Sequence, residues 1–509
     1  MSTRFSRVYS GELSGIDARC VEVEVDLHVG LHSFLIVGLA DKALTEARER
    51  VGAAIKNSGA KPPSQENRKI IVNLAPADIK KTGSQYDVAI AIGYLLATEQ
   101  IKKFNPAKKM FLGELALDGS IRPVTGVLNI VCMAREKGFE EIYVPETNAS
   151  EAAVAGGITI FPVRTLAELM AHLEGRAYLS PVTASAIHSS DTVPAIDIAD
   201  VRGQSAAKRA LLIAACGGHH VLMTGSPGSG KTMLAQAFAG ILPPLSYDEV
   251  LEVTRIYSAS NTLSGRHAVL DRPFRSPHHT ASSVAVVGGG SNPRPGEISL
   301  AHRGVLFLDE LPEFHRDVIE SLREPLESGR VTVARSHGSL TLPARFMLVA
   351  AMNPCPCGYY GDSRRDCACG AHEIARYKKK VSGPILDRID LQVLVPHVEL
   401  ADLSTTSPER ATIENSASMR ATVLRVRAIE MARQHTLNSA LSSKQVALHV
   451  ALTSEARSFF EKIWKGAMLS ARGYYRLLKV ARTIADIEGS HAVTEAHVAE
   501  AFAYRLREQ

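Results

Sequence analysis

The sequence lacks any hydrophobic run that approaches the roughly 18–20 residues needed to cross a membrane. Its N-terminus, MSTRFSRVYSGELSG, also lacks the apolar core of a secretory signal peptide. Hydrophobic residues make up 45% of the 509 and charged residues 22%, which is ordinary for a globular protein. We therefore expect a cytoplasmic protein with no membrane partner, and the length predicts two to four domains.

Cysteine is scarce, and neither sign of charge is in strong excess. The seven cysteines form an odd set without an export signal, so we expect reduced thiols. Cys20, Cys132 and Cys216 stand alone in apolar surroundings, which is typical of core packing. The net charge of +5 and the pI near 8.7 permit a polyanionic partner without demanding one.

The central motif is GSPGSGKT, which follows a short apolar run and precedes an apolar helix pattern. It fits G-x-x-x-x-G-K-[ST] in the strand–loop–helix context that a phosphate-binding loop needs. Its glycines allow backbone N–H groups to surround phosphates, and the helix dipole favours their charge. We expect Lys231 to reach the β- and γ-phosphates of ATP and Thr232 to ligate Mg²⁺. The predicted nucleotide site comprises Gly225, Ser226, Pro227, Gly228, Ser229, Gly230, Lys231 and Thr232.

Two carboxylates follow a second apolar strand in GVLFLDE, residues 304–310. The carboxyl ends of parallel strands meet at one edge of a sheet, so both acids should face the same phosphates. Asp309 suits a role at Mg²⁺, and Glu310 suits the polarisation of the attacking water.

Several further segments resemble AAA+ ATPases. The segment DVRGQ, residues 200–204, precedes the phosphate loop as an adenine-packing segment does in that class. Asn353 follows a third strand, where AAA+ proteins have an Asn that senses the γ-phosphate. SGPILDRID contains Arg388, which resembles the arginine finger of Mg-chelatase-type and MCM-type subunits; a surface pair with Asp387 is the alternative. Arg472 at the start of a long helix resembles the second sensor, with Arg476 as its competitor.

The remaining cysteines form a cluster in CPC and CAC. Paired cysteines in a cytosolic protein favour tetrahedral thiolate coordination, usually of Zn²⁺, although C-x-C is tighter than the common C-x-x-C spacing. Free thiols and a redox pair remain the alternatives, and His372 could replace one cysteine. Closed coordination would make the metal structural. The predicted ligands are Cys355, Cys357, Cys367 and Cys369.

Two inserted segments of the ATPase region are candidates for contact with the substrate. Residues 245–299 form a long insertion that includes His278 and His279, which we interpret as polar loop residues. Residues 329–342 predict a hairpin whose tip carries Arg335 and His337, the candidate contacts to the substrate. Both inserted segments resemble those that line or approach the ring pore in the MCM, Mg-chelatase and σ54-activator branch.

The N-terminal third alternates strand and helix patterns without a phosphate loop or metal spacing. KTGSQYD, residues 81–87, and GELALDGSIRPV, residues 113–124, resemble the Lon proteolytic domain, which implies a ribosomal-protein-S5-like fold. The Ser–Lys pair of that family does not carry over, because Gln85 stands at the serine position and no lysine stands at the matching one. We expect a non-catalytic scaffold. A Ser-, Thr-, Ala- and Pro-rich stretch follows as a linker.

Taken together, CPCGYYGD before SGPILDRID and LSARGYYRLLKVARTIADIEG near the C-terminus resemble the ComM/YifB family, often labelled Mg-chelatase-like. The resemblance covers nearly the full length. It implies a homo-hexameric, ATP-driven DNA motor that promotes branch migration in homologous recombination and natural transformation. A protein-remodelling or metal-insertion ATPase without DNA activity is the alternative, and proteolysis is a third.

The fold class expected is α/β with two such domains and a helical lid. The predicted parts are a Lon-like domain (1–176), a linker (177–197), an AAA+ core (198–400) with a cysteine-rich insertion (354–370), and a helical lid (401–509).

Overall fold

The computed structural model describes residues 5–38, 42–78, 81–182, 196–290, 294–335, 338–362, 364–398, 415–467 and 470–505. Contacts divide the chain into two compact units. The first contains residues 1–188 together with 246–270, and the second contains residues 189–245 and 271–509. Part of the insertion that follows the phosphate-loop helix in sequence therefore belongs to the N-terminal unit. The domain boundaries given above stay a prediction.

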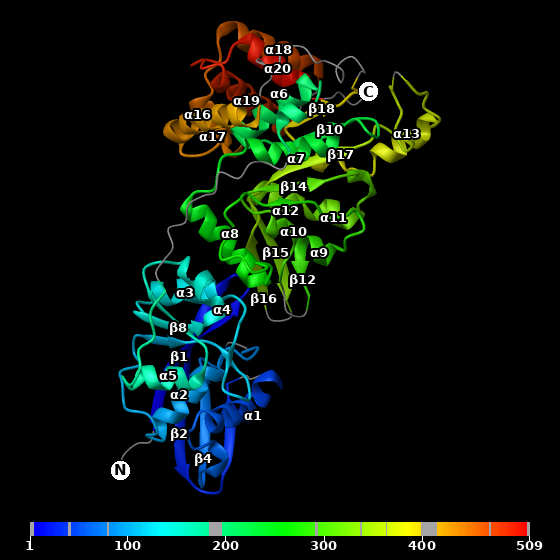
Figure 1. The fold of residues 1–509 in the computed structure, drawn as a ribbon. Helices are drawn as coiled ribbons and strands as arrows, with labels where there is room; N and C mark the ends of the chain where they lie inside the picture. Colours follow the sequence, from blue (N-terminus) through cyan, green and yellow to red (C-terminus); the bar gives the residue numbers. More distant parts are fainter. Residues whose placement is uncertain are drawn as a thin grey trace. The chain divides into compact units, whose positions relative to one another are not determined.

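The first unit is built on a seven-stranded mixed sheet in the order β3-β4-β2-β1-β5-β8-β9 (Figure 1). The alternating apolar residues of β2 are buried at every second position, because successive side chains point to opposite faces of a strand. Its strands are β1 (Phe5–Ser14), β2 (Asp17–Val29), β3 (Ser33–Val37), β4 (Arg68–Ala75), β5 (Lys109–Phe111), β8 (Glu141–Pro145) and β9 (Thr159–Val163). A separate hairpin pairs β6 (Glu114–Leu115) with β7 (Ile121–Arg122).

Helices complete this unit and cover two hydrophobic clusters. They are α1 (Lys42–Asn57), α2 (Asp87–Ala97), α3 (Val127–Glu136), α4 (Glu146–Ala153), α5 (Leu166–Leu173) and α8 (Tyr247–Ser260). Helix α8 comes from the insertion at residues 246–270. Its Tyr247 hydroxyl donates to the Val154 carbonyl at 3.0 Å, and the Ser258 hydroxyl donates to Glu151 at 2.5 Å.

The second unit contains a five-stranded parallel sheet in the order β11-β14-β17-β10-β18. The short apolar runs of the sequence form its central strands, which are buried because helices cover a parallel sheet. The strands are β10 (Val221–Thr224), β11 (Phe274–Arg275), β14 (Val305–Leu308), β17 (Met347–Met352) and β18 (Leu391–Leu394). Helices α6 (Ser205–Gly217) and α7 (Lys231–Ile241) flank them.

The C-terminal helices share one hydrophobic core with this sheet and its helices. This arrangement confirms the mixed α/β class with a helical C-terminal part. The C-terminal helices are α16 (Ser416–Gln434), α17 (Ser443–His449), α18 (Ser454–Ala467), α19 (Ala471–Ile487) and α20 (Glu495–Ala503). Smaller elements of the unit are α9 (Ser283–Val287), β12 (Gly288–Gly289), β13 (Arg294–Pro295), α10 (Glu297–Leu300), α11 (Arg316–Ser321), α12 (Arg323–Ser328), α13 (Ala371–Lys378) and α14 (Gly383–Leu386).

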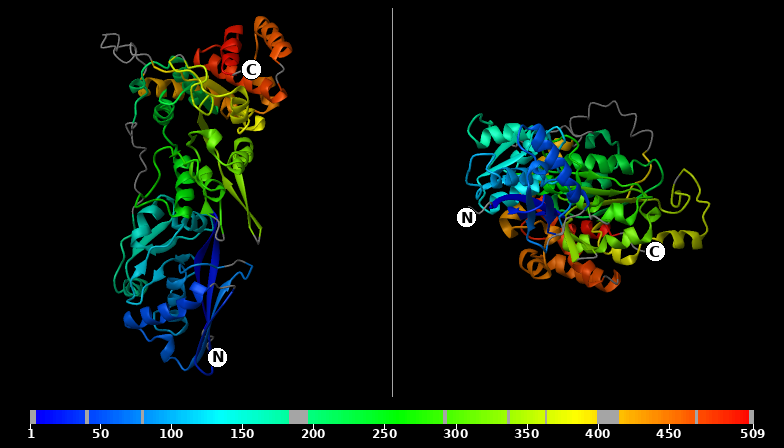
Figure 2. Two further views of the ribbon diagram at one scale, coloured as in Figure 1. Left: turned by 90° about the vertical axis from the view of Figure 1, so that its right-hand side faces the viewer. Right: turned by 90° about the horizontal axis from the view of Figure 1, so that it is seen from below.

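The hairpin predicted at residues 329–342 is present. β15 (Arg330–Arg335) pairs antiparallel with β16 (Gly338–Pro343) as a two-stranded sheet of its own, drawn in yellow-green in Figure 2. Of its predicted tip, His337 lies outside the described residues, and of Arg335 only the backbone is described. Within the described part of the chain, no helix is long and apolar enough to cross a membrane.

Candidate functional site

The phosphate loop joins the carboxyl end of β10 to the first residue of α7. Gly228 and Gly230 both have left-handed backbone conformations, with φ of 76° and 93°, which glycine adopts without steric cost. The Lys231 ammonium donates to the backbone carbonyls of Gly225 at 2.7 Å and Ser226 at 2.9 Å. Burial lowers the pKa of Lys231, while the nearby carboxylates oppose that shift. The loop thus folds around the Lys231 ammonium, which its own carbonyls bind. From there the side chain can reach a phosphate held by the loop.

The two carboxylates after β14 lie beside this loop. The Thr232 hydroxyl donates to Asp309 Oδ2 at 2.9 Å, and Asp309 Oδ1 accepts the backbone N–H of Glu310 at 2.9 Å. A hydroxyl and a carboxylate at the end of a phosphate loop are the oxygen donors that Mg²⁺ uses with nucleotide phosphates. These residues therefore fit a magnesium ion, and the structure places them together as the sequence predicts.

Glu310 is exposed and has an unusual backbone conformation. Its φ is 52°, a left-handed conformation that is uncommon for residues other than glycine and that concentrates at functional sites. The Nδ1 atom of His279 lies 3.4 Å from Glu310 Oε2. His279 is thus next to the candidate base. The sequence does not predict this contact, because residues 279 and 310 are far apart in the chain and come together only through the pairing of β11 with β14.

Asn353 reaches the same site from the neighbouring strand β17. Its side-chain oxygen accepts a hydrogen bond from the Lys231 ammonium at 3.3 Å. Because β17 lies between β14 and β10 in the sheet, the residues that follow these three strands meet at one edge.

The two candidate arginines, Arg388 and Arg472, meet at Glu327 of α12. Arg388 Nη2 donates to Glu327 Oε2 at 2.5 Å, and Arg472 Nη2 donates to Glu327 Oε1 at 3.1 Å. The hydrogen bond from Arg388 lowers the pKa of Glu327. Within the described residues, neither guanidinium has a hydrogen bond or ion pair to the phosphate loop of its own chain. The competitor Arg476 instead pairs with Asp390 at 2.7 Å.

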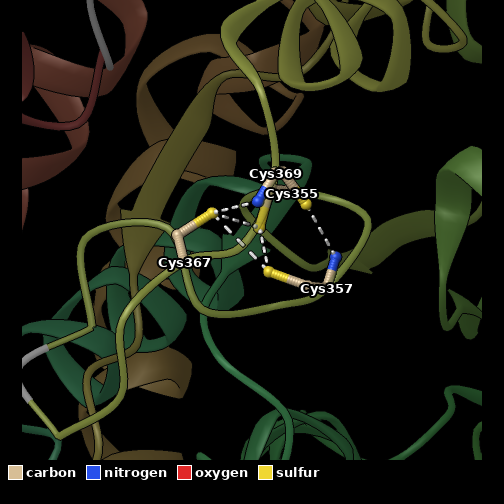
Figure 3. Close-up of side chains that lie close together, drawn as sticks. All are labelled: Cys355, Cys357, Cys367 and Cys369. Atoms are coloured by element: carbon tan, nitrogen blue, oxygen red, sulfur yellow. Dashed lines mark hydrogen bonds between the residues drawn. The ribbon is translucent and has the colours of Figure 1, made fainter.

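The four clustered cysteines converge immediately after Asn353 (Figure 3). Their sulfur atoms all lie within 4.8 Å of one another, and Cys355 Sγ lies 3.3 Å from that of Cys357 and 3.6 Å from that of Cys367. The Tyr360 N–H donates to Cys355 Sγ at 3.3 Å, the kind of outer hydrogen bond that orients metal thiolates. A backbone N–H from Tyr359 lowers the pKa of Cys357 to about 6. Four convergent thiols fit a tetrahedral zinc ion.

The fold and the site together define a phosphate-loop ATPase of the AAA+ class. Family models match most of the chain: magnesium chelatase, subunit ChlI, at residues 197–403; subunit ChlI of Mg-chelatase at residues 23–148; and the ChlI C-terminal domain at residues 413–505. The model over residues 197–403 contains the phosphate loop, both carboxylates, Asn353 and the four cysteines.

Comparison with individual proteins narrows the class. The chain is 42% identical to competence protein ComM of Haemophilus influenzae over 502 residues, which is 98% of this chain and 97% of that protein. It is 43% identical to YifB of Escherichia coli, again over 98% of this chain and 97% of that protein. The magnesium-chelatase 38 kDa subunit of Rhodobacter capsulatus is 26% identical over 62% of this chain and 89% of its own length. The chain belongs to the ComM/YifB family, and its AAA+ domains imply ATPase activity.

Proposed function

We propose that this protein is an ATP-driven DNA motor that promotes branch migration during homologous recombination and natural transformation, and that it works in the cytoplasm. The observation that carries the motor part is the meeting of Lys231, Asp309 and Asn353 at the carboxyl edge of one parallel sheet. These are the parts that phosphoryl transfer needs: a phosphate grip, an acid for Mg²⁺ and a polar sensor of the γ-phosphate.

Each residue then has its own task in hydrolysis. Lys231 exchanges its backbone carbonyl partners for phosphate oxygens, and Thr232 with Asp309 holds Mg²⁺. Glu310 accepts the proton of the attacking water, since its carboxylate is exposed and follows directly after Asp309, which contacts Thr232 at the end of the phosphate loop. His279, at 3.4 Å, is in a position to orient that carboxylate.

The active form that we propose is a homo-hexameric ring with shared sites. Arg388 and Arg472 both point to Glu327 and not to their own phosphate loop. Such a placement supports a role for Arg388 as an arginine finger in the neighbouring subunit's site, because its fixed charge is suited to the transferring phosphoryl group.

DNA as the substrate is supported by the chain-long similarity to a competence protein, by the mildly basic charge and by the separate β15–β16 hairpin. Arg335 and His337 of that hairpin remain the candidate DNA contacts. A structural Zn²⁺ at Cys355, Cys357, Cys367 and Cys369 completes the proposal and rests on the convergence of their sulfur atoms.

ATPase assays with single-stranded, duplex and branched DNA test this function, together with electrophoretic mobility shifts over a range of salt. DNA should stimulate hydrolysis, and binding should weaken as salt rises because lysine and arginine contacts release counterions. The similarity to the magnesium-chelatase 38 kDa subunit supports a second candidate, a metal-insertion or protein-remodelling ATPase. ATP hydrolysis that ignores DNA, with no detectable DNA binding, would favour that second candidate.

A further inference from the structure

The loop that carries the four cysteines packs directly on the phosphate loop. Gly358 has a left-handed φ of +87°, and a Cβ atom added to it would lie 2.6 Å from Pro227 Cδ and 2.7 Å from Pro227 Cγ. Cβ atoms do not approach other atoms so closely, so only glycine lets the two loops meet here. The backbone of one loop thus rests on the proline ring of the other.

A buried carboxylate makes a second contact between these two loops. Asp362 has a side chain that is only 2% exposed, and its Oδ2 atom accepts the Ser226 hydroxyl at 2.5 Å. His397 Nε2 lies 3.2 Å from the same oxygen. The other oxygen, Oδ1, accepts the backbone N–H groups of Arg364 at 2.8 Å and Arg365 at 3.2 Å. The hydrogen bond from Ser226 is the largest of the effects that lower the pKa of Asp362.

Ser226 connects this carboxylate to the phosphate-binding lysine. Its hydroxyl is bound by Asp362, and its backbone carbonyl accepts the Lys231 ammonium at 2.9 Å. A hydrogen bond to an ionised acceptor is stronger than one between neutral groups. Asp362 therefore fixes the orientation of the residue against which Lys231 is held.

The four cysteines flank the segment that carries Asp362 and Gly358. Both residues lie between Cys357 and Cys367, in a segment without helix or strand among its described residues. A metal ion that binds all four thiolates closes this loop and removes much of its conformational freedom. Without a metal, the contacts between the two cysteine pairs are weak hydrogen bonds to sulfur, such as that from Cys357 N–H to Cys369 Sγ at 3.4 Å, while Asp362 keeps its bonds from Arg364 and Arg365.

We propose that the cysteine loop, residues 355–362 and 364–369, is a positioning part of the nucleotide site, in which a bound metal holds Asp362 and Gly358 against the phosphate loop. Loss of the metal then weakens nucleotide binding. The inference rests on two parts of the proposed function, namely that ATP binds at the phosphate loop and that a metal binds the four cysteines. It adds Asp362 and Gly358 as positioning residues and makes metal occupancy a condition of full affinity.

The role of Asp362 is tested by the affinity of the full-length protein for a fluorescent ATP analogue. Asp362→Ala removes the acceptor for Ser226 and should weaken the affinity about tenfold, the order expected for a hydrogen bond to a charged group. Asp362→Asn keeps an oxygen acceptor of the same shape and should lose much less. Zinc content, measured by atomic absorption, should stay at one per chain in both variants. Equal or tighter binding by Asp362→Ala would overturn the inference.

Two glycines of the loop provide a matched pair of variants. Gly358 and Gly361 both have left-handed conformations, with φ of +87° and +77°, so alanine brings similar backbone strain at each. Only the Cβ atom at residue 358 would strike Pro227, since an added Cβ at residue 361 has nothing within 4 Å. Gly358→Ala should therefore weaken nucleotide binding severalfold more than Gly361→Ala. Equal affinities in the two variants would show that the contact between Gly358 and Pro227 does not affect nucleotide binding.

Removal of the metal tests whether metal binding at the cysteine loop controls nucleotide affinity. The wild-type protein is stripped with a chelator, and its nucleotide affinity is compared before stripping, after stripping and after zinc is restored. Affinity should fall at least as far as in Asp362→Ala and should return with zinc, while circular dichroism confirms that the fold persists. Unchanged affinity in the stripped protein would refute the coupling. If the zinc-loaded wild-type protein binds no nucleotide at all, the proposed function fails together with this inference.

Discussion

Lys231 is held by the carbonyls of its own loop, whereas Glu310 is exposed and has no part in that grip. The two side chains therefore serve separate steps, and their variants should fail in different ways. Lys231→Ala should abolish nucleotide binding or turnover. Glu310→Gln should bind ATP with nearly unchanged affinity and hydrolyse it at least about 10²-fold more slowly, the scale of a lost general base. Nucleotide titrations and steady-state phosphate release measure both effects. Near-normal turnover by Glu310→Gln would exclude it as the base.

Glu430 in α16 gives a prediction about stability and pH. Its carboxyl group is fully buried, and one of its oxygens has no hydrogen-bond partner. Burial, reinforced by the negative charge of Asp486, raises the pKa of Glu430 to about 8 from its ordinary value of 4.5. Arg427 and Arg433 oppose that shift but do not cancel it.

The sign of the effect follows from proton uptake. Between pH 4.5 and 8 the folded protein binds a proton at Glu430 that the unfolded chain has released, so stability falls as pH rises, by about 1.4 kcal/mol per unit at most. Glu430→Gln removes this group. Denaturant unfolding at pH 5 and pH 8 should show the variant gaining stability relative to wild type at the higher pH. Glu461→Gln, at an exposed position of α18, is the control and should show no such gain.

Sequence patterns indicated that Asp309 and Asn353 lie near the phosphate loop. Both residues follow strands, and the carboxyl ends of parallel strands meet at one edge of the sheet. The patterns did not predict Glu327, Asp362 or His279. Each of these lies in a turn, loop or short helix and meets its partner only through the tertiary fold. Charged and polar residues of this kind are common on surfaces, so nothing in their local sequence separates them from solvent-exposed neighbours.

Among the elements, the largely apolar run at residues 110–115 has the pattern of one strand but forms parts of two strands in different sheets. Gly113 separates β5 from β6 with a φ of +147°, a conformation that a continuous strand does not contain. Hydrophobic alternation alone does not reveal such a break. The helices and the β15–β16 hairpin follow their patterns closely, since their periodicity and turn residues act locally.

Helix α8 is the element whose place in the molecule the sequence did not indicate. Its Leu251 packs against the hydrophobic cluster of the N-terminal unit, which contains Leu128 of α3. Leu128→Ala should cost that unit roughly 2–5 kcal/mol. Hydrogen exchange should then accelerate in α8 together with α3, while α7 keeps its protection.

Leu211→Ala provides the matched control, because Leu211 of α6 is equally buried but belongs to the cluster of the second unit. In that variant exchange should accelerate in α7 and leave α8 unchanged. If α8 followed α7 in both variants, its assignment to the N-terminal unit would be wrong.

At the scale of the whole molecule, Arg388 is the residue that would connect one subunit to the next in the ring that we propose. Asn353 follows directly after β17 and contacts Lys231 of its own chain. Arg388 follows α14, and its guanidinium is paired with Glu327, which also binds Arg472. A site that takes its phosphate loop from one subunit and its arginine from the next is complete only in the oligomer.

Arg388→Ala should leave nucleotide affinity nearly intact and reduce turnover by roughly 10³-fold or more, as the loss of an arginine finger does. Mixing distinguishes action in the same subunit from action in the neighbour. A hexamer that combines Arg388→Ala and Lys231→Ala subunits contains neighbours that jointly supply one sound phosphate loop and one sound finger, so some ATPase activity should return. Mass spectrometry of differently tagged subunits shows whether the rings have mixed. If mixed hexamers form and no ratio of the two variants restores hydrolysis, Arg388 does not act on the neighbouring subunit's nucleotide.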